Sequence, residues 1–402
     1  MEEWKTYKIG EISEVNKSQY SPKENWQNFL YLDTGSITRN QIDSIQTISL
    51  ATELPSRARR KVVNFDIVYS TVRPNQCHYG ILKNPKTNLL VSTGFAVITV
   101  NQEVANPLFV YYYLTQDYII DALQAIAEQS VSAYPSIKPS DIEDVEVYLP
   151  PLNIQNTIAN ILSSLASKIK LNNRINHNLE EQAQALYKSW FVDFEPFKDG
   201  KFIESELGMI PEGWRVGSIY EHVNVIYGAP YKSALFNENK NGFPLIRIRD
   251  LKDCKPQFYT PELLPNSEFV MSGDIVAGMD ADFSPHLWKG ETGLLNQRVC
   301  KFEPIDKTIS NYYVLMLIKP ELEFISSYKV GTTVSHLGKA DIDRIRVILP
   351  PLKIVRDFSI ISEQLLQMII AHSSECRILR TQLNTLLPKL MSGELKINEI
   401  DC

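Results

Sequence analysis

The sequence predicts an α+β protein: two similar mixed α/β domains separated by two long helices that form an antiparallel coiled coil with pseudo-two-fold symmetry. Three observations predict this fold: a block of sequence that recurs after half the chain, a long proline-free amphipathic stretch in each copy, and short β-branched runs elsewhere. We expect a first globular domain over 1–150, a first helical region with its linker over 151–204, a second globular domain over 205–350 and a second helical region over 351–402.

The repeated block opens with a strand-like run that ends in two prolines. Residues 141–152 read DIEDVEVYLPPL, and residues 341–352 read DIDRIRVILPPL. The register then holds without a gap, because Ile161, Leu179 and Leu186 each meet the same residue 200 positions later. Proline lacks the donor that a strand ladder needs, so each Pro-Pro pair ends its strand. The pattern predicts two copies of one structural unit.

Each copy continues as a long amphipathic helix. No proline interrupts the first copy before Pro196 or the second before Pro388. Apolar residues recur at spacings of three and four, the pattern of a helix that packs on another helix. A helix from Leu152 to Trp190 would be about 58 Å long at ~1.5 Å per residue. The simplest partner for each helix is the other copy.

Polar residues interrupt the apolar stripe near the middle of each helix. They are Asn172 and Asn176 in the first copy and His372 in the second. Two copies related by a pseudo-two-fold axis pack their helices antiparallel, so we expect these three side chains to meet near that axis. Asn172 and His372 are the pair that we expect to fix the register. The alternative, that they are polar residues tolerated at the solvent edge, stays open.

Bulk properties constrain the class of protein. The net charge of −6 argues against a nucleic-acid binder unless cations cluster locally or a partner supplies phosphate contacts. No apolar run approaches the ~20 residues that span a bilayer, and the N-terminus lacks the apolar core of a signal peptide. The five cysteines are scattered without CxxC spacing, so we expect reduced thiols in a cytoplasmic protein.

The linker between the two halves carries a family resemblance. LYKSWFVDFEPF at 186–197 and ESELGMIPEGWRV at 204–216, together with the two LPPL-helix blocks, resemble the specificity subunits of type I restriction–modification enzymes. The resemblance covers essentially the whole chain. One departure is that Val355 and Arg356 stand where the first copy has Gln155 and Asn156, which weakens the inferred methyltransferase contact at that helix.

The resemblance implies a function for the repeat. Each globular domain is expected to be a target-recognition domain that reads one half of a bipartite site in double-stranded DNA, with the helical rod setting the spacer. The implied partners are two methyltransferase subunits and, in some complexes, restriction and translocase subunits. No cofactor is expected on this chain, whereas S-adenosylmethionine and ATP are expected on the partner subunits.

Within the first domain, two stretches offer DNA-binding chemistry. PSRARRKV gathers Arg57, Arg59, Arg60 and Lys61, which predicts a phosphate-sized cationic cluster. STVRPNQCHYG and the later QSVSAYPSIK supply further candidates, because arginine suits guanine and amides suit adenine. These are Arg73, Asn75, Gln76, His78, Tyr79, Ser132 and Tyr134. An ordinary polar loop remains the alternative.

The second domain offers a different set. Arg247 and Arg249 alternate with isoleucines, so both should point to one face of a strand. GMDADFSPHLWKG, the following NQR and the Ser/Thr-rich VGTTVSHLGK add the remaining candidates. These are Asp280, Phe283, His286, Lys289, Gln297, Arg298, Thr333 and His336. Arg298 could equally be an ion-pair partner of a nearby acid.

Catalytic motifs are missing from the sequence. It has no GxxxxGK[ST] for ATP, no GxGxxG for a dinucleotide and no metal-ligand spacing. Both Pro-Pro pairs read Leu-Pro-Pro-Leu and lack the amide or acid and the aromatic of amino-methyltransferases. We therefore expect a non-catalytic subunit that binds no metal. The alternatives are part of a fused restriction–methylation enzyme, or a dumbbell scaffold that does not bind DNA, which the acidic charge favours slightly.

Overall fold

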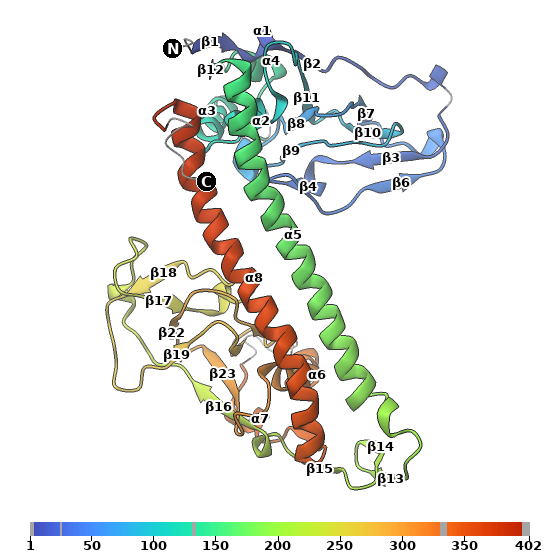
Figure 1. Cartoon of the computed structure of the whole chain (residues 1–402), viewed down its shortest axis with the longest axis vertical. Coiled ribbons are helices and arrows are strands. Elements are labelled where there is room, and N and C mark those ends of the chain that lie inside the picture. Colours follow the sequence, from blue (N-terminus) through green and yellow to red (C-terminus); the bar gives the residue numbers. More distant parts are fainter. Residues whose placement is uncertain (1–3, 25, 131–133, 330–335, 396–402) are drawn as a thin grey trace. The chain divides into compact units, whose positions relative to one another are not determined.

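The computed structural model describes residues 4–24, 26–130, 134–329 and 336–395 (Figure 1). The chain divides into two compact units, Met1–Ser167 with Leu379–Cys402, and Lys168–Ile378. Two long helices, α5 (Leu152–Phe191) and α8 (Leu352–Ser392), therefore contribute residues to both units. None of the helices in the described part of the chain combines the length and the apolar character needed to cross a bilayer.

The first unit is built on two four-stranded sheets. Its strands are β1 (Lys5–Lys8), β2 (Ser13–Val15), β3 (Phe29–Leu32), β4 (Ile37–Thr38), β5 (Gln41–Ile42), β6 (Gln46–Ile48), β7 (Ala58–Lys61), β8 (Ile67–Ser70), β9 (Tyr79–Ile81), β10 (Leu89–Ser92), β11 (Phe95–Val100) and β12 (Glu146–Leu149). The short helices are α1 (Ile9–Ile12), α2 (Pro107–Leu114), α3 (Asp117–Glu128) and α4 (Pro139–Glu143). The sheet orders are β2-β11-β8-β9 and β6-β3-β10-β7, and β1 pairs with β12.

The second unit repeats this plan. Its strands are β13 (Phe202–Ser205), β14 (Gly208–Pro211), β15 (Arg215–Ser218), β16 (Val223–Tyr227), β17 (Phe243–Ile246), β18 (Phe258–Thr260), β19 (Phe269–Val270), β20 (Ile275–Gly278), β21 (Pro285–Leu287), β22 (Gly293–Leu295), β23 (Val299–Pro304) and β24 (Arg346–Leu349). The helices are α6 (Asn311–Lys329) and α7 (Lys339–Ile342). The sheet orders β16-β23-β20-β21 and β18-β17-β22-β19 match those of the first unit strand for strand.

The match extends to strand direction. The only described parallel pairs within these four-stranded sheets are β3 with β10 and β17 with β22, which occupy the same place in each unit. The ladder of β15 and β24 corresponds to that of β1 and β12. Two mixed α/β domains of one plan, as the sequence predicts, are therefore confirmed.

A buried aspartate fixes the turn before the central strand of each unit. Asp66 accepts a hydrogen bond from the Val63 amide, and Asp274 accepts one from the Met271 amide, both at 2.8 Å. The residue before each aspartate has a left-handed backbone, with φ of 67° at Phe65 and 104° at Gly273. Burial raises the pKa of both carboxyls. The weak similarity between 65–68 and 273–276 thus reflects one shared turn.

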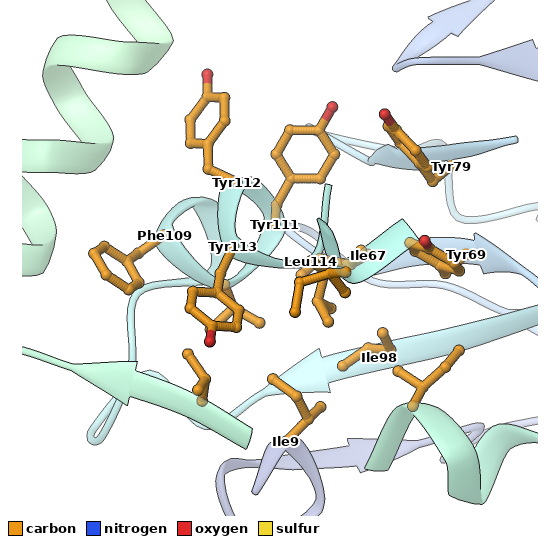
Figure 2. Packing of buried hydrophobic residues seen from close by; sticks show 14 of the residues in the cluster. Ile9, Ile67, Tyr69, Tyr79, Ile98, Phe109, Tyr111, Tyr112, Tyr113 and Leu114 are labelled. Atoms are coloured by element: carbon orange, nitrogen blue, oxygen red, sulfur yellow. The ribbon is translucent and has the colours of Figure 1, made fainter. Parts of the chain in front are cut away.

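Tyrosines fill much of the first unit's main core. Figure 2 shows Tyr111 of α2 between Tyr112 of the same helix and Tyr79 of the sheet, with Tyr69 next to Tyr79. The ring centroid of Tyr79 lies 5.5 Å from that of Tyr69 and 6.3 Å from that of Tyr111. Burial raises the pKa of each of these phenols and keeps the row neutral. Tyr113 points the other way, and its hydroxyl donates to the Glu146 carbonyl at 2.9 Å.

The long helices pair antiparallel within each unit. In the second unit, Asn172 of α5 donates to Glu375 of α8 at 2.6 Å, and Asn176 donates to the Ile369 carbonyl at 3.2 Å. The partner number falls as the α5 number rises, which defines antiparallel packing. In the first unit, Ile158 and Leu162 share a core with Leu390 and Met391. The predicted antiparallel helix pair is confirmed, and α5 begins at the predicted residue.

Part of the predicted apolar stripe on α8 is not covered within the second unit. Ile361 and Met368 are each 42% exposed, and the neighbouring Ile360 is 64% exposed. A groove of about 370 Å³ beside them is lined by Thr308, Ser359, Ile360, Glu363, Gln364 and Gln367. Three apolar side chains of α8 are therefore left partly exposed, and Ile360 is the one that lines this groove.

The buried His222 makes the stability of the second unit depend on pH. Its Nδ1 lies 3.1 Å from the Tyr313 hydroxyl, and burial lowers its pKa below 6.5 although Glu221 opposes the shift. The unfolded chain then binds a proton that the folded unit does not, so stability falls as pH drops below about 6.5.

We expect the urea midpoint of unfolding to fall between about pH 7.5 and 5.5. His222→Gln should remove part of this dependence on pH. His177→Gln, at an exposed histidine, is the control, and an equal change in slope from both variants would contradict the assignment.

Candidate nucleic-acid interface

The loop between β8 and β9 carries Arg73, Asn75, Gln76 and His78, four of the first domain's predicted DNA-binding residues. A short 3-10 turn, η4 (Pro74–Gln76), follows Arg73, whose φ of 48° is left-handed. Asn75 and Gln76 are exposed on this turn. The Asn75 amide donates to the Gln124 side chain of α3 at 3.2 Å, which ties the turn to the helix.

Tyr134 supports Arg73 from a distant part of the sequence. The Arg73 guanidinium lies 5.1 Å from the centroid of the Tyr134 ring, within range of a cation–π interaction. The Arg73 amide also donates to the Pro135 carbonyl at 2.9 Å. Tyr134 therefore lies at the same edge of the first domain as Arg73, Asn75 and Gln76.

Sequence reasoning missed Arg39, which lies beside this loop. Arg39 and Asn40, with φ of 46° and 65°, form the turn of the β4–β5 hairpin. Their amides donate to the carbonyls of Cys77 and Tyr79 at 2.9 and 2.8 Å. His78 joins the hairpin, because its Nδ1 lies 2.7 Å from the Ile37 carbonyl and must carry the proton. Asn40 signals a turn, but no local pattern predicts that this turn packs on residues 77–79.

The predicted cationic cluster at 57–61 is divided between two faces of β7. In the ladder of β7 with β10, Arg60 pairs with Val91 and Lys61 with Leu90, so the two side chains point to opposite faces. The Arg60 Nη2 donates to the Thr93 carbonyl at 3.2 Å. Lys61 lies on the other face, where its Nζ pairs with Glu24 at 2.9 Å. The expectation of one joint cluster was wrong for this reason.

Arg57 and Arg60 are both linked, through the turn at Thr93 and Gly94, to the edge that carries Arg73. The Thr93 amide donates to the Arg57 carbonyl, and the Gly94 carbonyl accepts from the Thr71 amide, both at 2.8 Å. Nε and Nη1 of Arg60 are buried and have no hydrogen-bond partner among the described residues, and burial lowers the pKa of this guanidinium. Arg57 is exposed and is the better placed of the two for a phosphate.

Two predicted aromatic contacts belong to the core instead of the surface. Tyr79 is 5% exposed and lies in the tyrosine row of Figure 2, and Phe283 is fully buried in the second unit. Their apolar rings gain more from burial than from an exposed loop. The structure therefore corrects the surface positions expected for them.

Arg247 and Arg249 do not share a strand face. Strand β17 ends at Ile246, and a 3-10 turn, η8 (Ile248–Asp250), follows. Asp250 ends the strand, because its carboxylate accepts from the Arg247 amide at 3.0 Å. The Arg247 guanidinium then packs 4.3 Å from the centroid of Phe258, while Arg249 is exposed.

The hairpin of β20 and β21 separates the remaining candidates. Asp280 follows β20, whereas Lys289 lies beyond the far end of β21, where its Nζ pairs with Glu180 at 2.9 Å. His286 lies between them, opposite Val276, and lines a groove of about 220 Å³ with Lys289 and Lys319. Asp280, His286 and Lys289 are therefore spread along this hairpin.

Asp280 instead meets residues from two other segments. Its Oδ1 lies 2.7 Å from His336 Nδ1, and its Oδ2 lies 3.6 Å from Arg298 Nε. The ion-pair alternative for Arg298 is thus present in the structure. Gln297 is exposed next to Arg298.

The polar helix residues form one cluster in the helix pair. His372 Nδ1 lies 3.2 Å from Asn176 Oδ1, and Asn172 contacts Glu375. His372 therefore meets Asn176 and not Asn172. Whether the cluster fixes the register stays a prediction.

Ser132 and Thr333 lie outside the described residues. Among those that are described, no group of three or more His, Cys, Asp or Glu side chains is placed to hold a metal ion.

Comparison with known proteins matches both halves of the chain. The family model for the type I restriction modification DNA specificity domain matches residues 1–181 and 211–373. The chain is 24% identical to the HindI specificity subunit of Haemophilus influenzae, covering 98% of this chain and all of that one. It is 28% identical to the MjaIX specificity subunit of Methanocaldococcus jannaschii, covering 80% of this chain and 76% of that one.

The fold also matches a solved structure. The type I restriction-modification S subunit from M. genitalium superimposes with a TM-score of 0.56 at 16% identity, covering 97% of this chain and 96% of that one. At this identity the likeness concerns the fold alone. The two family-model matches, one to each half of the repeat, show that the chain belongs to the type I restriction modification DNA specificity domain family.

Proposed function

We propose that this chain is the non-catalytic DNA-recognition subunit of a type I restriction–modification complex. Each domain reads one half of a bipartite site in double-stranded DNA, and the paired helices set the spacer. One observation carries the proposal: two domains with the same backbone plan carry different polar side chains at the same edge, Arg73 with Tyr134 in one and Arg298 with Asp280 in the other. One backbone plan with different polar side chains is what two domains that recognise different DNA sequences require.

The partners in this proposal are two methyltransferase subunits and, in a restricting complex, restriction and translocase subunits. The groove along α8 and the exposed Ile360 in its lining support a docking role for the helix. S-adenosylmethionine and ATP would then bind the partners. The acidic net charge is compatible with this, because the partners would supply further phosphate contacts.

The test is co-expression with the methyltransferase encoded beside this chain, followed by methylation-aware sequencing of the host DNA. We expect a bipartite methylated motif that disappears when this chain is deleted. Exchanging residues 1–150 for those of a relative should change one half of the motif only. A folded, methyltransferase-bound complex that methylates no motif would contradict the proposal.

Arg73 is expected to contribute to binding of the first half-site. Arg73→Ala should weaken binding of the assembled complex to its site by roughly tenfold, as expected for loss of a charged contact to a base or phosphate. If the contact is a phosphate, the slope of log K against log salt should also fall by about 0.9. Fluorescence anisotropy at several salt concentrations measures both.

Arg59→Ala is the matched control, because Arg59 lies outside the β8–β9 loop, at the irregularity of the β7–β10 ladder, and its Nε donates to the Ser56 carbonyl at 3.3 Å. Equal losses in the two variants would indicate a general charge effect and would contradict a specific contact at Arg73.

A further inference from the structure

The same backbone hydrogen bonds join three segments in both units. In the first unit, the Thr71 amide donates to the Gly94 carbonyl and the Ile137 amide donates to the Thr71 carbonyl, both at 2.8 Å. In the second, the Met279 amide donates to the Arg298 carbonyl at 2.9 Å and the Leu337 amide donates to the Met279 carbonyl at 2.8 Å. Arg298 therefore occupies the position of Gly94.

The next residues along the chain correspond as well. Val72 forms an isolated antiparallel bridge with Ser136, and Asp280 forms one with His336. The residues after them, Arg73 and Ala281, are both left-handed, with φ of 48° and 64°. The backbone is thus conserved between the units while the side chains are exchanged.

The exchange replaces an uncharged set by a charged one. Val72, Gly94 and Ser136 in the first unit stand where the second unit has Asp280, Arg298 and His336. A Cβ at Gly94 would lie 2.9 Å from the Thr34 Cγ2 atom, so a side chain there would require Thr34 to shift. It carries its arginine one residue beyond Val72 instead, at Arg73. Two domains that share a backbone but bind different DNA sequences are expected to differ in their side chains at such positions.

The contacts of Arg298 match those of a base-reading arginine. Its side chain is 56% exposed, and its Nε lies 3.6 Å from Asp280 Oδ2. Within the described chain, its guanidinium donates no hydrogen bond, so both terminal Nη groups stay available. A carboxylate beside Nε restricts the orientation of the Arg298 guanidinium, so its side chain loses less conformational entropy on binding. The Nη groups suit the O6 and N7 acceptors of guanine.

Asp280 is a supporting group in this arrangement. Its side chain is only 27% exposed, and each carboxylate oxygen faces a partner, His336 Nδ1 on one side and Arg298 Nε on the other. These partners reduce the electrostatic repulsion between the Asp280 carboxylate and the DNA phosphates. They also leave Asp280 poorly placed to accept a hydrogen bond from a cytosine amino group.

We propose that Arg298 is a specificity-determining residue of the second domain, which reads a guanine, and that Asp280 and His336 are positioning residues that hold its guanidinium. This inference rests on the proposed function. It assigns a G·C pair to the half-site read by residues 205–350.

The test uses the full chain with its methyltransferase and methylation-aware sequencing. Arg298→Ala should relax one guanine position of one half-site, with discrimination reduced by roughly tenfold to a hundredfold, while the other half stays unchanged. Asp280→Asn should relax the same position to a smaller extent. Arg215→Ala is the matched control, because Arg215 is 60% exposed and also pairs with an acid of the second unit, Glu221, and it should leave the motif intact.

A second measurement needs no variant. The wild-type complex should lose affinity when one guanine of that half-site is replaced by 7-deazaguanine, which lacks the N7 acceptor, and Arg298→Ala should abolish this difference. An unchanged motif in Arg298→Ala, equal loss of methylation at all sites from an assembled complex, or insensitivity to every 7-deazaguanine would each overturn the assignment. Failure of the wild-type complex to methylate any motif would instead refute the proposed function.

Discussion

Phe358→Ala is expected to destabilise the second unit by about 3–5 kcal/mol, the usual cost of removing a large core aromatic. Phe358 of α8 is fully buried, and its ring centroid lies 5.0 Å from that of Phe191 and 5.9 Å from that of Tyr187. These aromatic side chains come from α5 and α8, so the cavity would remain where the two helices meet the domain. Urea unfolding followed by tryptophan emission measures the loss, because Trp190 lies 5.9 Å from the same ring.

Phe324→Ala provides the comparison for this variant. Phe324 is 67% exposed on α6, so its removal should change the stability of the second unit by less than about 1 kcal/mol. Similar losses in the two variants would show that the ring cluster around Phe358 does not hold this unit together.

Asn176→Leu is expected to destabilise the helix pair by about 1–3 kcal/mol. Asn176 is 7% exposed and donates to the Ile369 carbonyl at 3.2 Å and to Ser373 Oγ at 3.0 Å. Its Oδ1 also lies 3.2 Å from His372 Nδ1. Leucine would leave these buried groups without their partner, which costs more than the added apolar contact returns.

Asn172→Leu should have a much smaller effect, or the opposite one. The Nδ2 of Asn172 donates to Glu375 at 2.6 Å, but its Oδ1 is buried and has no hydrogen-bond partner in the described residues. Leucine would remove that unsatisfied oxygen, while Glu375 keeps Lys168 at 3.5 Å. Urea midpoints of the two variants decide the matter. A larger loss from Asn172→Leu would contradict the structural ranking and would favour the register role first expected of Asn172 with His372.

Regular elements with their own periodicity were predictable from the sequence. The helix from Leu152 follows from an uninterrupted three- and four-residue spacing, and its antiparallel partner follows from the repeat. The α/β plan that the two domains share was visible only in short matches, such as the turns at Asp66 and Asp274. Many of the strands that pair in each sheet are far apart in the sequence, so their pairing leaves no local pattern.

The candidate site was harder to predict, since it is assembled from distant segments. Arg39 meets residues 77–79 through backbone hydrogen bonds, and Tyr134 meets Arg73 across 61 positions of sequence. Residue type alone also failed where a local hydrogen bond decided the backbone. Asp250 ends β17 and so removes Arg247 from the strand face that alternation suggested.

The left-handed backbone at Arg73 has an evolutionary consequence. A residue other than glycine pays roughly 1–2 kcal/mol for this conformation, and β-branched side chains tolerate it worst. Mutations at this position that change the DNA sequence bound by the first domain are therefore restricted to a few residue types without a branched Cβ. Valine, isoleucine and threonine should be rare there among descendants with new specificities, whereas asparagine, lysine and glycine should be common. The fold thus narrows which new DNA targets a single codon change can reach.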